Sequence, residues 1–169
     1  MVIRQKKRNS HQIVLMIGGN RGDRLQLIND AKMLLSEAGK ITTASSIFET
    51  APWGAASEGS YLNQALVIET ETPPEDFILL SQSIETMLGR IRTRSWGNRT
   101  MDIDLLYDGD RVYREKDLII PHPRIAERRF VLVPLVEILP DFIHPVLNLS
   151  NRELLKRCRD ESSVEIFRQ

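Results

Sequence analysis

The fold is set by the stretch QIVLMIGGNRGDRLQLINDAKMLLSEAG, residues 12–39, which combines a strand, a turn and a helix. Its first residues are mostly apolar, several are β-branched, and Gly18-Gly19 ends the run, as is typical of a buried strand. Asn20 or Asp23 can cap the following helix, in which apolar residues recur every three or four positions. Gly39 stands where that helix is expected to end. The chain therefore opens with a buried strand and an amphipathic helix.

The remainder of the chain continues this alternation. Further strands are expected at residues 41–48, 62–69 and 101–107, with short extra strands at 111–112 and 118–120. Thr72-Pro73-Pro74-Glu75 combines a capping box with a proline at the first helical position, so it predicts a second helix, which Gly89 would end. A short helix is expected at 124–129, an apolar segment at 130–138 and a last helix at 153–159. Polar loops at 50–60 and 90–100 separate these elements.

The order strand, helix, strand, strand, helix, strand is the split βαβ pattern. It predicts an α+β fold, an antiparallel sheet with helices packed on one face. Because 41% of the 169 residues are hydrophobic, the chain can build one core. We therefore expect a single domain over residues 11–169, preceded by a solvated, disordered basic tail at 1–10.

Composition narrows the classes of function. Lys plus Arg and Asp plus Glu number 23 each, which argues against a protein whose whole surface binds nucleic acid or an anionic membrane. The single cysteine, Cys158, excludes intramolecular disulfides and cysteine-based metal centres. The longest early apolar run, residues 13–17, is too short for a membrane-spanning helix of about 20 residues or a signal peptide of about 7–15. These features fit a reducing, cytoplasmic environment.

Chemistry concentrates in residues 89–104, GRIRTRSWGNRTMDID, and first at their acidic end. Successive strand residues point to opposite faces, so Asp102 and Asp104 stand side by side while Ile103 points into the core. Two adjacent carboxylates repel each other, and a cation such as Mg²⁺, which takes carboxylate and phosphate oxygens, relieves that repulsion. The alternative is a pair of solvated acids at an exposed strand end.

The loop before the acidic pair favours a metal–polyphosphate ligand. Arg90, Arg92, Arg94 and Arg99 lie within ten residues that contain no acid, and the chain has 17 Arg against 6 Lys. Guanidinium groups bind phosphates bidentately, and phosphoryl transfer needs metal ions beside fixed cations. A merely solvated basic loop is the alternative. The turn at 18–23 lacks the Gly-Lys-Ser/Thr ending of a Walker A motif, so we interpret it as the turn into the first helix.

Two further groups of residues suit a flat heterocycle and an anion. Tyr61 and Asn63 share a strand face, where an aromatic ring can stack on a heterocycle and an amide can bond its edge. His122 lies between two prolines, Arg128 can reach an anion and Phe130 can pack on a ring. Structural alternatives remain: Tyr61 in the rim of the core, Asn63 capping a turn and His122 as a structural histidine.

Together these residues resemble the 6-hydroxymethyl-7,8-dihydropterin pyrophosphokinase family over about residues 14–140. The motifs occur in the family's order: Gly18-Gly19-Asn20, Ser45-Ser46-x-Phe48-x-Thr50-x-Pro52-x-Gly54, Tyr61-Leu62-Asn63, Gln82-x-x-Glu85, Gly89-Arg90-x-Arg92, Trp96-Gly97-x-Arg99-x-x-Asp102-x-Asp104, Pro121-His122 and Arg128-x-Phe130. The Trp-Gly-x-Arg-x-x-Asp-x-Asp run in the company of the others is highly specific. The chain departs from the family at Ser95, where a basic residue usually precedes the tryptophan, and at Asn98, where proline is usual.

The resemblance implies a ferredoxin-like α/β fold and an enzyme of folate biosynthesis that uses ATP and two Mg²⁺ ions. The hydroxymethyl oxygen of the pterin would attack the β-phosphorus of ATP, giving AMP and the pterin diphosphate. By position, Asp102 and Asp104 would hold the metal ions, and Arg92 and Arg99 would be catalytic with them. The implied nucleotide site contains Gln82, Glu85, Arg92, Trp96, Arg99, Ile103, His122 and Arg128, and the implied pterin site contains Thr50, Ala51, Trp53, Tyr61, Asn63, Asp102 and Phe130.

Two other classes of function stay open from the sequence. The same strand order serves RNA-binding modules, but aromatic residues make up only 6% of the chain and the acidic pair would repel a nucleic-acid backbone. A regulatory domain could keep the small-molecule pocket without turnover. The expected partners are therefore ATP and the dihydropterin, with neither a nucleic acid nor a membrane.

Overall fold

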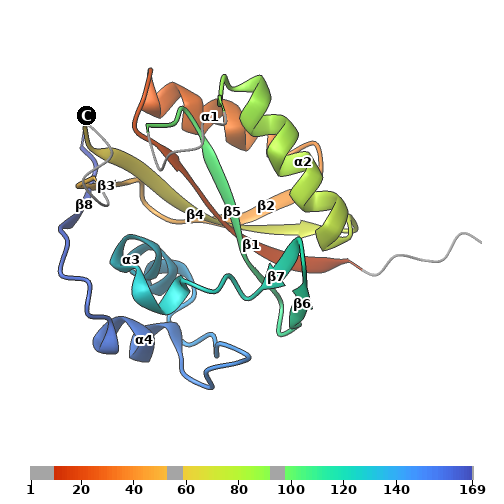
Figure 1. Ribbon diagram of the computed structural model, residues 1–169, viewed down its shortest axis with the longest axis vertical. Helices are drawn as coiled ribbons and strands as arrows, with labels where there is room; N and C mark the ends of the chain where they lie inside the picture. The colour runs from red at the N-terminus through yellow and green to blue at the C-terminus, as the bar shows by residue number, and fades with distance from the viewer. Residues whose placement is uncertain (1–9, 53–58, 92–97, 169) are drawn as a thin grey trace, which may run out of the picture.

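The computed structural model describes residues 10–52, 59–91 and 98–168, and an antiparallel sheet forms its centre (Figure 1). The strands are β1 (His11–Gly19), β2 (Lys40–Ala44), β3 (Phe48–Thr50), β4 (Tyr61–Thr70), β5 (Asp102–Asp108) and β8 (Val164–Ile166). Their hydrogen-bonded order is β5-β1-β4-β3-β8, and β2 also pairs with β4. A separate hairpin pairs β6 (Tyr113–Glu115) with β7 (Leu118–Ile120). The predicted split βαβ order and the antiparallel sheet are confirmed.

Helices cover both faces of this sheet. On one face, α1 (Arg24–Leu35) and α2 (Pro74–Met87) lie side by side, as Figure 1 shows. On the other face lie α3 (Arg129–Ile138) and α4 (Asn151–Arg157), with the short 3₁₀ turn η1 (Ile125–Glu127) before α3. The two helices of the split βαβ pattern therefore pack on one face, as predicted, and α3 and α4 add a layer on the other face that the sequence did not predict.

The residues of β1 explain why both faces of the sheet are covered. Ile13, Leu15 and Ile17 belong to the core cluster beneath α1 and α2. Val14 and Met16 belong to a second cluster that includes residues of α3 and α4. A strand that is apolar on both faces must be covered on both, and such strands have continuous rather than alternating apolar runs. The unbroken run in β1 is therefore the sequence feature that indicates the second helical layer.

The first helix begins, but does not end, where the sequence predicts. Asp23 is its N-cap, and the side chain accepts a hydrogen bond from the backbone N–H of Gln26 at 3.0 Å. The helix ends at Leu35, before Gly39. A Cβ atom at Gly39 would lie 2.5 Å from the carbonyl oxygen of Glu69. Gly39 is therefore needed for close packing of the backbone against β4, and the prediction that it ends the helix is wrong.

The second helix keeps its predicted proline and glycine but not its capping box. Pro74 occupies the first helical position, as predicted. The N-cap is Pro73, which has no capping side chain, so the expected box from Thr72 does not form. Gly89 follows the helix with a φ of +82°, the left-handed conformation that glycine adopts at little cost.

Some strands and turns differ from their predicted bounds. The predicted strand 41–48 is divided into β2 and β3, which both pair with β4. The short strand expected at 111–112 begins instead at Tyr113, and the helix expected at 124–129 is only the turn η1. The apolar segment 130–138 forms most of α3.

The C-terminal segment, which the sequence analysis left unassigned, ties two parts of the molecule together. The Asp160 carboxylate accepts a hydrogen bond from the first backbone N–H of α3, that of Arg129, at 2.9 Å. Beyond it, β8 pairs with β3, with Val164 opposite Thr50. This segment therefore fixes the start of α3 relative to β3.

Candidate active site

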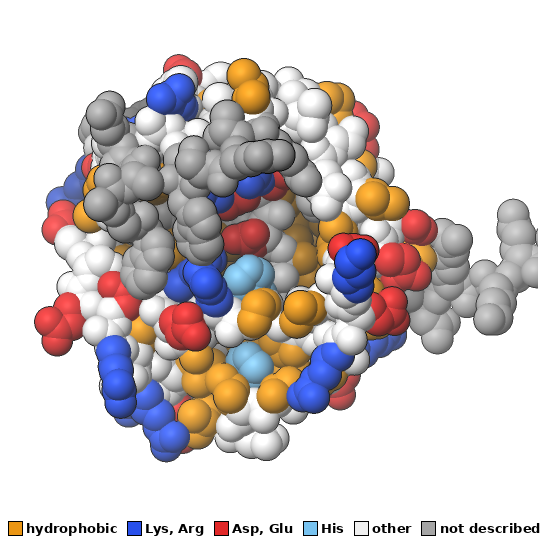
Figure 2. All heavy atoms as spheres, in the orientation of Figure 1, with side chains coloured by type: hydrophobic (Ala, Val, Ile, Leu, Met, Phe, Trp, Pro, Cys, Tyr) orange, Lys and Arg blue, Asp and Glu red, His pale blue; other side chains and the backbone are white. Residues whose placement is uncertain are grey.

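A cavity of about 300 Å³ opens on the α3 side of the sheet. Figure 2 shows this hollow, with acidic, basic and histidine side chains gathered around it. The lining residues are Met16, Gly18, Thr50, Ala51, Tyr61, Asn63, Arg90, Arg99, Asp102, Asp104, His122, Arg128 and Phe130. Segments far apart in the sequence, from β1, β3, β4, β5 and the start of α3, therefore meet in one wall.

The two acids of β5 face this cavity together. Asp102 and Asp104 both line it, whereas Ile103 and Leu105 belong to the core cluster on the opposite face. The prediction that the carboxylates share one face is confirmed. Burial and the neighbouring charge of Asp102 raise the pKa of Asp104 to about 7. The pair is therefore a site where added positive charge would be stabilised.

Guanidinium groups already surround the acids. Arg90 Nη1 lies 2.6 Å from Asp102 Oδ1, and Arg99 Nη1 bonds the other oxygen, Asp102 Oδ2. Arg128 Nη1 lies 4.0 Å from Asp104 Oδ2, and burial lowers its pKa. Three cations thus converge on two carboxylates, and guanidinium groups are side chains well suited to bind phosphate oxygens.

Arg90 is the one cation here that the predicted site did not contain. It stands next to the implied Arg92 in the motif Gly89-Arg90-x-Arg92, so its place in the motif was the available signal. Besides Asp102, Arg90 Nη1 contacts Glu85 Oε1 at 2.5 Å. Because Glu85 is 4% exposed, this ion pair anchors Arg90 to α2.

Three residues implied for the nucleotide lie outside the cavity wall. Glu85 is turned into the protein, where Oε1 accepts a hydrogen bond from the backbone N–H of Ile103 at 2.8 Å. Ile103 itself is a core residue on the far face of β5. Gln82 is exposed on α2. Glu85 thus bonds both the start of β5 and Arg90 from the interior of the protein.

The cavity wall also contains aromatic and amide side chains. Thr50 pairs with Tyr61 across β3 and β4, and Asn63 donates from Nδ2 to the hydroxyl oxygen of Thr50 at 2.9 Å. Phe130 lies in the first turn of α3, and the guanidinium carbon of Arg128 is 5.7 Å from the centroid of the Phe130 ring. These rings and polar groups can hold a flat heterocycle by stacking and by hydrogen bonds to its edge.

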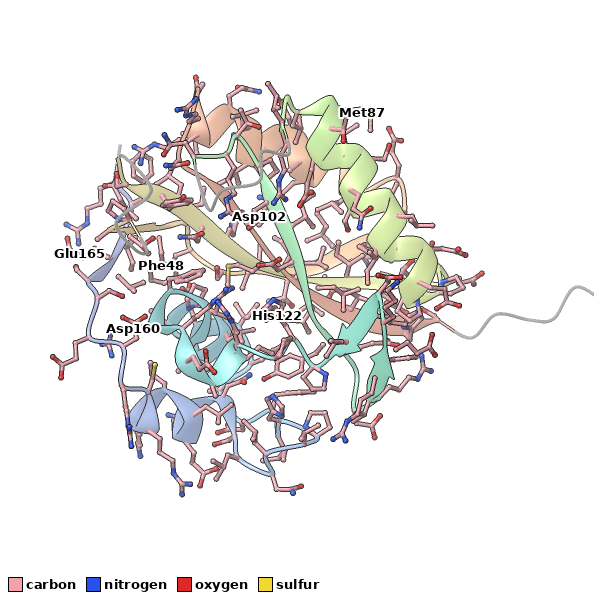
Figure 3. All side chains as sticks on the ribbon, viewed as in Figure 1. Phe48, Met87, Asp102, His122, Asp160 and Glu165 are labelled. Atoms are coloured by element: carbon pink, nitrogen blue, oxygen red, sulfur yellow. The ribbon has the colours of Figure 1, made fainter. Side chains whose placement is uncertain are left out.

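His122 lies between the acidic end and α3, as Figure 3 shows. Its Nδ1 accepts a hydrogen bond from the backbone N–H of Arg124 at 3.2 Å. Burial, together with the nearby charge of Arg128, lowers the pKa of His122 to about 4. The ring is therefore neutral at physiological pH, with its proton on Nε2, and it can donate one hydrogen bond without adding charge.

Two wall residues that the sequence analysis did not include in the site come from β1. Met16 and Gly18 line the cavity, and both alternate with core residues along the strand. A Cβ atom at Gly18 would lie 2.4 Å from both Asn63 Oδ1 and the Leu62 carbonyl oxygen, so only glycine permits this approach. The strand period could have indicated both.

The remaining expectations for the site lie outside the described residues. They concern Trp53, Arg92 and Trp96, and with them the departure at Arg94 and Ser95. Within the described residues, no three side chains of the His, Cys, Asp and Glu types gather as a metal site. No helix in that part of the chain has the length and apolar character needed to cross a membrane.

Comparisons with known proteins agree with this geometry. Residues 14–140 match the model of the 7,8-dihydro-6-hydroxymethylpterin-pyrophosphokinase family. The chain is 36% identical to the 2-amino-4-hydroxy-6-hydroxymethyldihydropteridine pyrophosphokinase of Aquifex aeolicus over 155 residues, which cover 92% of this chain and 94% of that protein. It is 42% identical to the enzyme of the same name from Bacillus subtilis over 157 residues, 92% of this chain and 89% of that protein.

The solved structures agree in fold. The wild-type Plasmodium falciparum HPPK-DHPS with SDX-DHP superposes with a TM-score of 0.73 at 17% identity, covering 90% of this chain. The match spans only 45% of that longer chain. Enzymes of this family move the pyrophosphoryl group of ATP to the hydroxymethyl group of the dihydropterin in folate synthesis. Because the family match spans most of the chain, this chain belongs to the 7,8-dihydro-6-hydroxymethylpterin-pyrophosphokinase family and is an ATP-dependent diphosphotransferase.

Proposed function

We propose that this one cavity holds ATP, two Mg²⁺ ions and 6-hydroxymethyl-7,8-dihydropterin together. The observation that carries the proposal is that the acidic pair, three arginines and the aromatic and amide groups all line the same 300 Å³ space. The polyphosphate would lie at the acidic end and the pterin between Tyr61 and Phe130. The hydroxymethyl oxygen would then attack the β-phosphorus, with AMP as the leaving group.

The acidic pair suits magnesium. Mg²⁺ takes one or two carboxylates and completes its octahedron with water and substrate phosphate oxygens, so Asp102 and Asp104 are a sufficient protein contribution. Burial and the charge of Asp102 raise the pKa of Asp104, so its carboxylate is stabilised when positive charge is added beside it. When bound, the metal ions would supply Lewis-acid polarisation of the phosphate oxygens.

The arginines would bind and orient the phosphates. Arg90, Arg99 and Arg128 are held near the carboxylates in the free protein. Because guanidinium binds phosphate bidentately, they would pass from the acids to the polyphosphate and stabilise charge on its oxygens during transfer. Arg92 is proposed to join them, and it is one of the residues outside the described part of the chain.

The pterin would be recognised by stacking and by its polar edge. Tyr61 and Phe130 would enclose its two faces. Thr50, Ala51, Asn63 and Trp53 would lie along its edge, where amide and hydroxyl groups match the donors and acceptors of the ring. The hydroxymethyl group would then point towards Asp102, which both substrates would share.

The rest of the nucleotide would lie beyond the phosphates. His122 is proposed to donate from Nε2 to a phosphate or ribose oxygen. Gln82, Glu85, Ile103 and Trp96 complete the proposed nucleotide site, with Glu85 contributing through the backbone of Ile103 rather than from the wall. We further propose one domain over 11–169 and a cytoplasmic location, where ATP is available. The tail expected at 1–10 lies outside the described residues except for Ser10.

The test is AMP release. Purified protein is mixed with ATP and the dihydropterin alcohol, and AMP is followed in a coupled assay with and without Mg²⁺. AMP that forms only when both substrates and Mg²⁺ are present supports the proposal. Tight binding of both substrates by calorimetry without AMP release would identify a regulatory binding domain instead. Equal AMP release after chelation of all divalent ions would contradict the magnesium role.

A further inference from the structure

The turn that joins β1 to α1 holds a segment of the cavity wall. The backbone N–H groups of Asn20 and Arg21 both donate to the carbonyl oxygen of Arg99, at 3.0 and 3.2 Å. Asn20 Oδ1 accepts the Arg99 N–H at 2.8 Å, and Asn20 Nδ2 donates to Asn98 Oδ1 at 2.8 Å. Both peptide groups of Arg99 are therefore fixed by one turn that lies 79 positions away in the sequence.

Gly19 makes this contact possible. A Cβ atom at Gly19 would lie 2.2 Å from the carbonyl oxygen of Thr100 and 2.9 Å from that of Arg99. Real Cβ atoms do not approach backbone oxygens so closely, so any other residue would push the two segments apart. The Gly-Asn pair thus lets two backbones meet and then bonds them.

Arg99 needs such support because it lies outside regular structure. Residues 98–101 come before the first residue of β5, Asp102, and belong to no strand. The Arg99 guanidinium bonds Asp102 and lines the cavity, so its reach depends on where its own backbone stands. The bonds to Asn20 and Arg21 replace the ladder bonds that a strand would provide.

This arrangement also shows what the turn does not do. A glycine-containing turn before a helix can bind phosphate through its free backbone N–H groups. Here the N–H groups of Asn20 and Arg21 are both engaged by Arg99. The backbone N–H groups that a phosphate-binding loop would offer to a phosphate are therefore bonded to the protein in this turn.

We propose that Asn20 is a positioning residue, which acts on the reaction through Arg99 by fixing its backbone. The inference rests on the proposed function, in which the Arg99 guanidinium binds the transferred phosphates. Loss of the Asn20 side chain removes the bond to the Arg99 N–H and the bond to Asn98, so the guanidinium would lose its fixed origin. Misplacement of a catalytic group by about 1 Å can cost on the order of 100-fold in rate.

The kinetic test is a double-mutant cycle in the full chain. Asn20→Ala, Arg99→Ala and the double variant are compared with the wild type in the AMP-release assay at saturating ATP and Mg²⁺. We expect Asn20→Ala to lower kcat about 10- to 100-fold, with KM for the pterin changed less than about threefold. In the Arg99→Ala background the same substitution should cost less than about twofold, because its effect passes through the missing side chain.

The structural test does not depend on activity. Amide hydrogen exchange of Arg99 should be slow in the wild type and at least about tenfold faster in Asn20→Ala, because one N–H acceptor is lost. Asn29→Ala, on the exposed face of α1, is the matched control and should change neither exchange nor kcat. If Asn20→Ala does not fold, Asn20→Ser enters the same measurements.

The outcomes separate the two proposals. Unchanged exchange at Arg99, or a full additional loss of kcat in the Arg99→Ala background, would overturn the positioning role. Wild-type protein that releases no AMP would overturn the proposed function. In that case the exchange measurement still decides whether Asn20 fixes Arg99.

Discussion

Two clusters built around carboxylates stand at opposite ends of β5, and they differ in how the charge of the carboxylates is balanced. At the start of the strand, the side chains of Asp102 and Asp104 are 25% and 30% exposed, and they face arginines in the cavity. At its end, Asp108 is completely buried, and its two oxygens are bonded by His11, Arg111 and Tyr113.

The two clusters differ in whether the partners of the carboxylates can be exchanged. Arginine side chains are long and can exchange one anionic partner for another, so the first cluster can admit metal ions and phosphates. The partners of Asp108 come mostly from rings that are packed in place. Its negative charge in turn raises the pKa of Arg111, and burial with the bond to Asp108 raises that of Tyr113. In the proposed function, aspartate therefore serves binding at the start of the strand, whereas at the end of the strand it serves stability.

His11 completes the second cluster. Nδ1 bonds Asp108 Oδ1, and Nε2 lies 3.0 Å from the carbonyl oxygen of Thr72. The ring therefore joins the start of β1 both to the end of β5 and to Thr72, which precedes α2.

The largest expected effect is the loss of stability when the buried carboxylate of Asp108 is removed. Asp108→Ala leaves the His11 ring and the Tyr113 hydroxyl without their acceptor, and each buried polar group left without a partner costs about 1–3 kcal/mol. Urea unfolding should therefore show a lower midpoint with an unchanged slope. Asp110→Ala, at an exposed position two residues on, is the control and should stay near the wild type.

The activity of the folded Asp108→Ala protein sharpens the contrast. Under conditions where the variant remains folded, kcat should lie within about twofold of the wild type, because the residue is outside the cavity wall. A large loss of kcat with unchanged stability would mean that the two ends of β5 are not separate.

The opposite result is expected at the start of the strand. Asp104→Asn removes one carboxylate from the cavity, and turnover should fall on the order of 100- to 1,000-fold, as when one group that stabilises transition-state charge is lost. The melting temperature should stay the same or rise, because the substitution removes the repulsion with Asp102. Asp117→Asn, at an exposed position, serves as the control. Near-native turnover would contradict the metal role of Asp104.

The shared face of Asp102 and Asp104 could be predicted from sequence because a two-residue spacing within a strand is local geometry. The strand period does not extend to Asp108. Val14 pairs with Tyr107 and Leu15 with Leu105, so Leu106 is an extra residue in β5. Leu106 and Tyr107 then belong to the same core cluster, and the alternation is reversed beyond them. Nothing in the local pattern of residues 102–108 places that bulge.

Contacts between strands and between a helix and the sheet also could not be predicted from the periodicity of the sequence. The bond from His11 to Asp108 spans 97 positions, and it depends on which strands are neighbours. The orientation of Glu85 is a similar case: helical spacing placed it on one face of α2 with Gln82, but only the packing of α2 on β5 decides that it bonds Ile103. Residue types and spacing gave the candidates, and tertiary packing decided which of them reach the cavity.

A smaller loss is expected when the ring partner of Asp108 is removed. His11→Ala leaves the carboxylate with Arg111 and Tyr113 and should cost about 1–3 kcal/mol, the usual result of leaving a buried group short of a partner. Chemical unfolding measures this. Ser10→Ala, which removes an exposed hydrogen bond to Glu69, is the neighbouring control and should change stability by less than about 0.5 kcal/mol. Equal losses in the two variants would show that burial of Asp108 does not strengthen its bonds.

The smallest effect isolates one hydrogen bond. Tyr113→Phe keeps the ring but removes the hydroxyl that lies 2.9 Å from Asp108 Oδ2, so stability should fall by about 1–2 kcal/mol. In the Asp108→Ala background the same substitution should cost less than about 0.5 kcal/mol, because the hydroxyl has already lost its acceptor. The coupling between the two positions measures how far Asp108 depends on fixed partners. If Tyr113→Phe costs the same in both backgrounds, the hydroxyl is stabilised by something other than Asp108, and the contrast with the exchangeable arginines of the cavity would lose its basis.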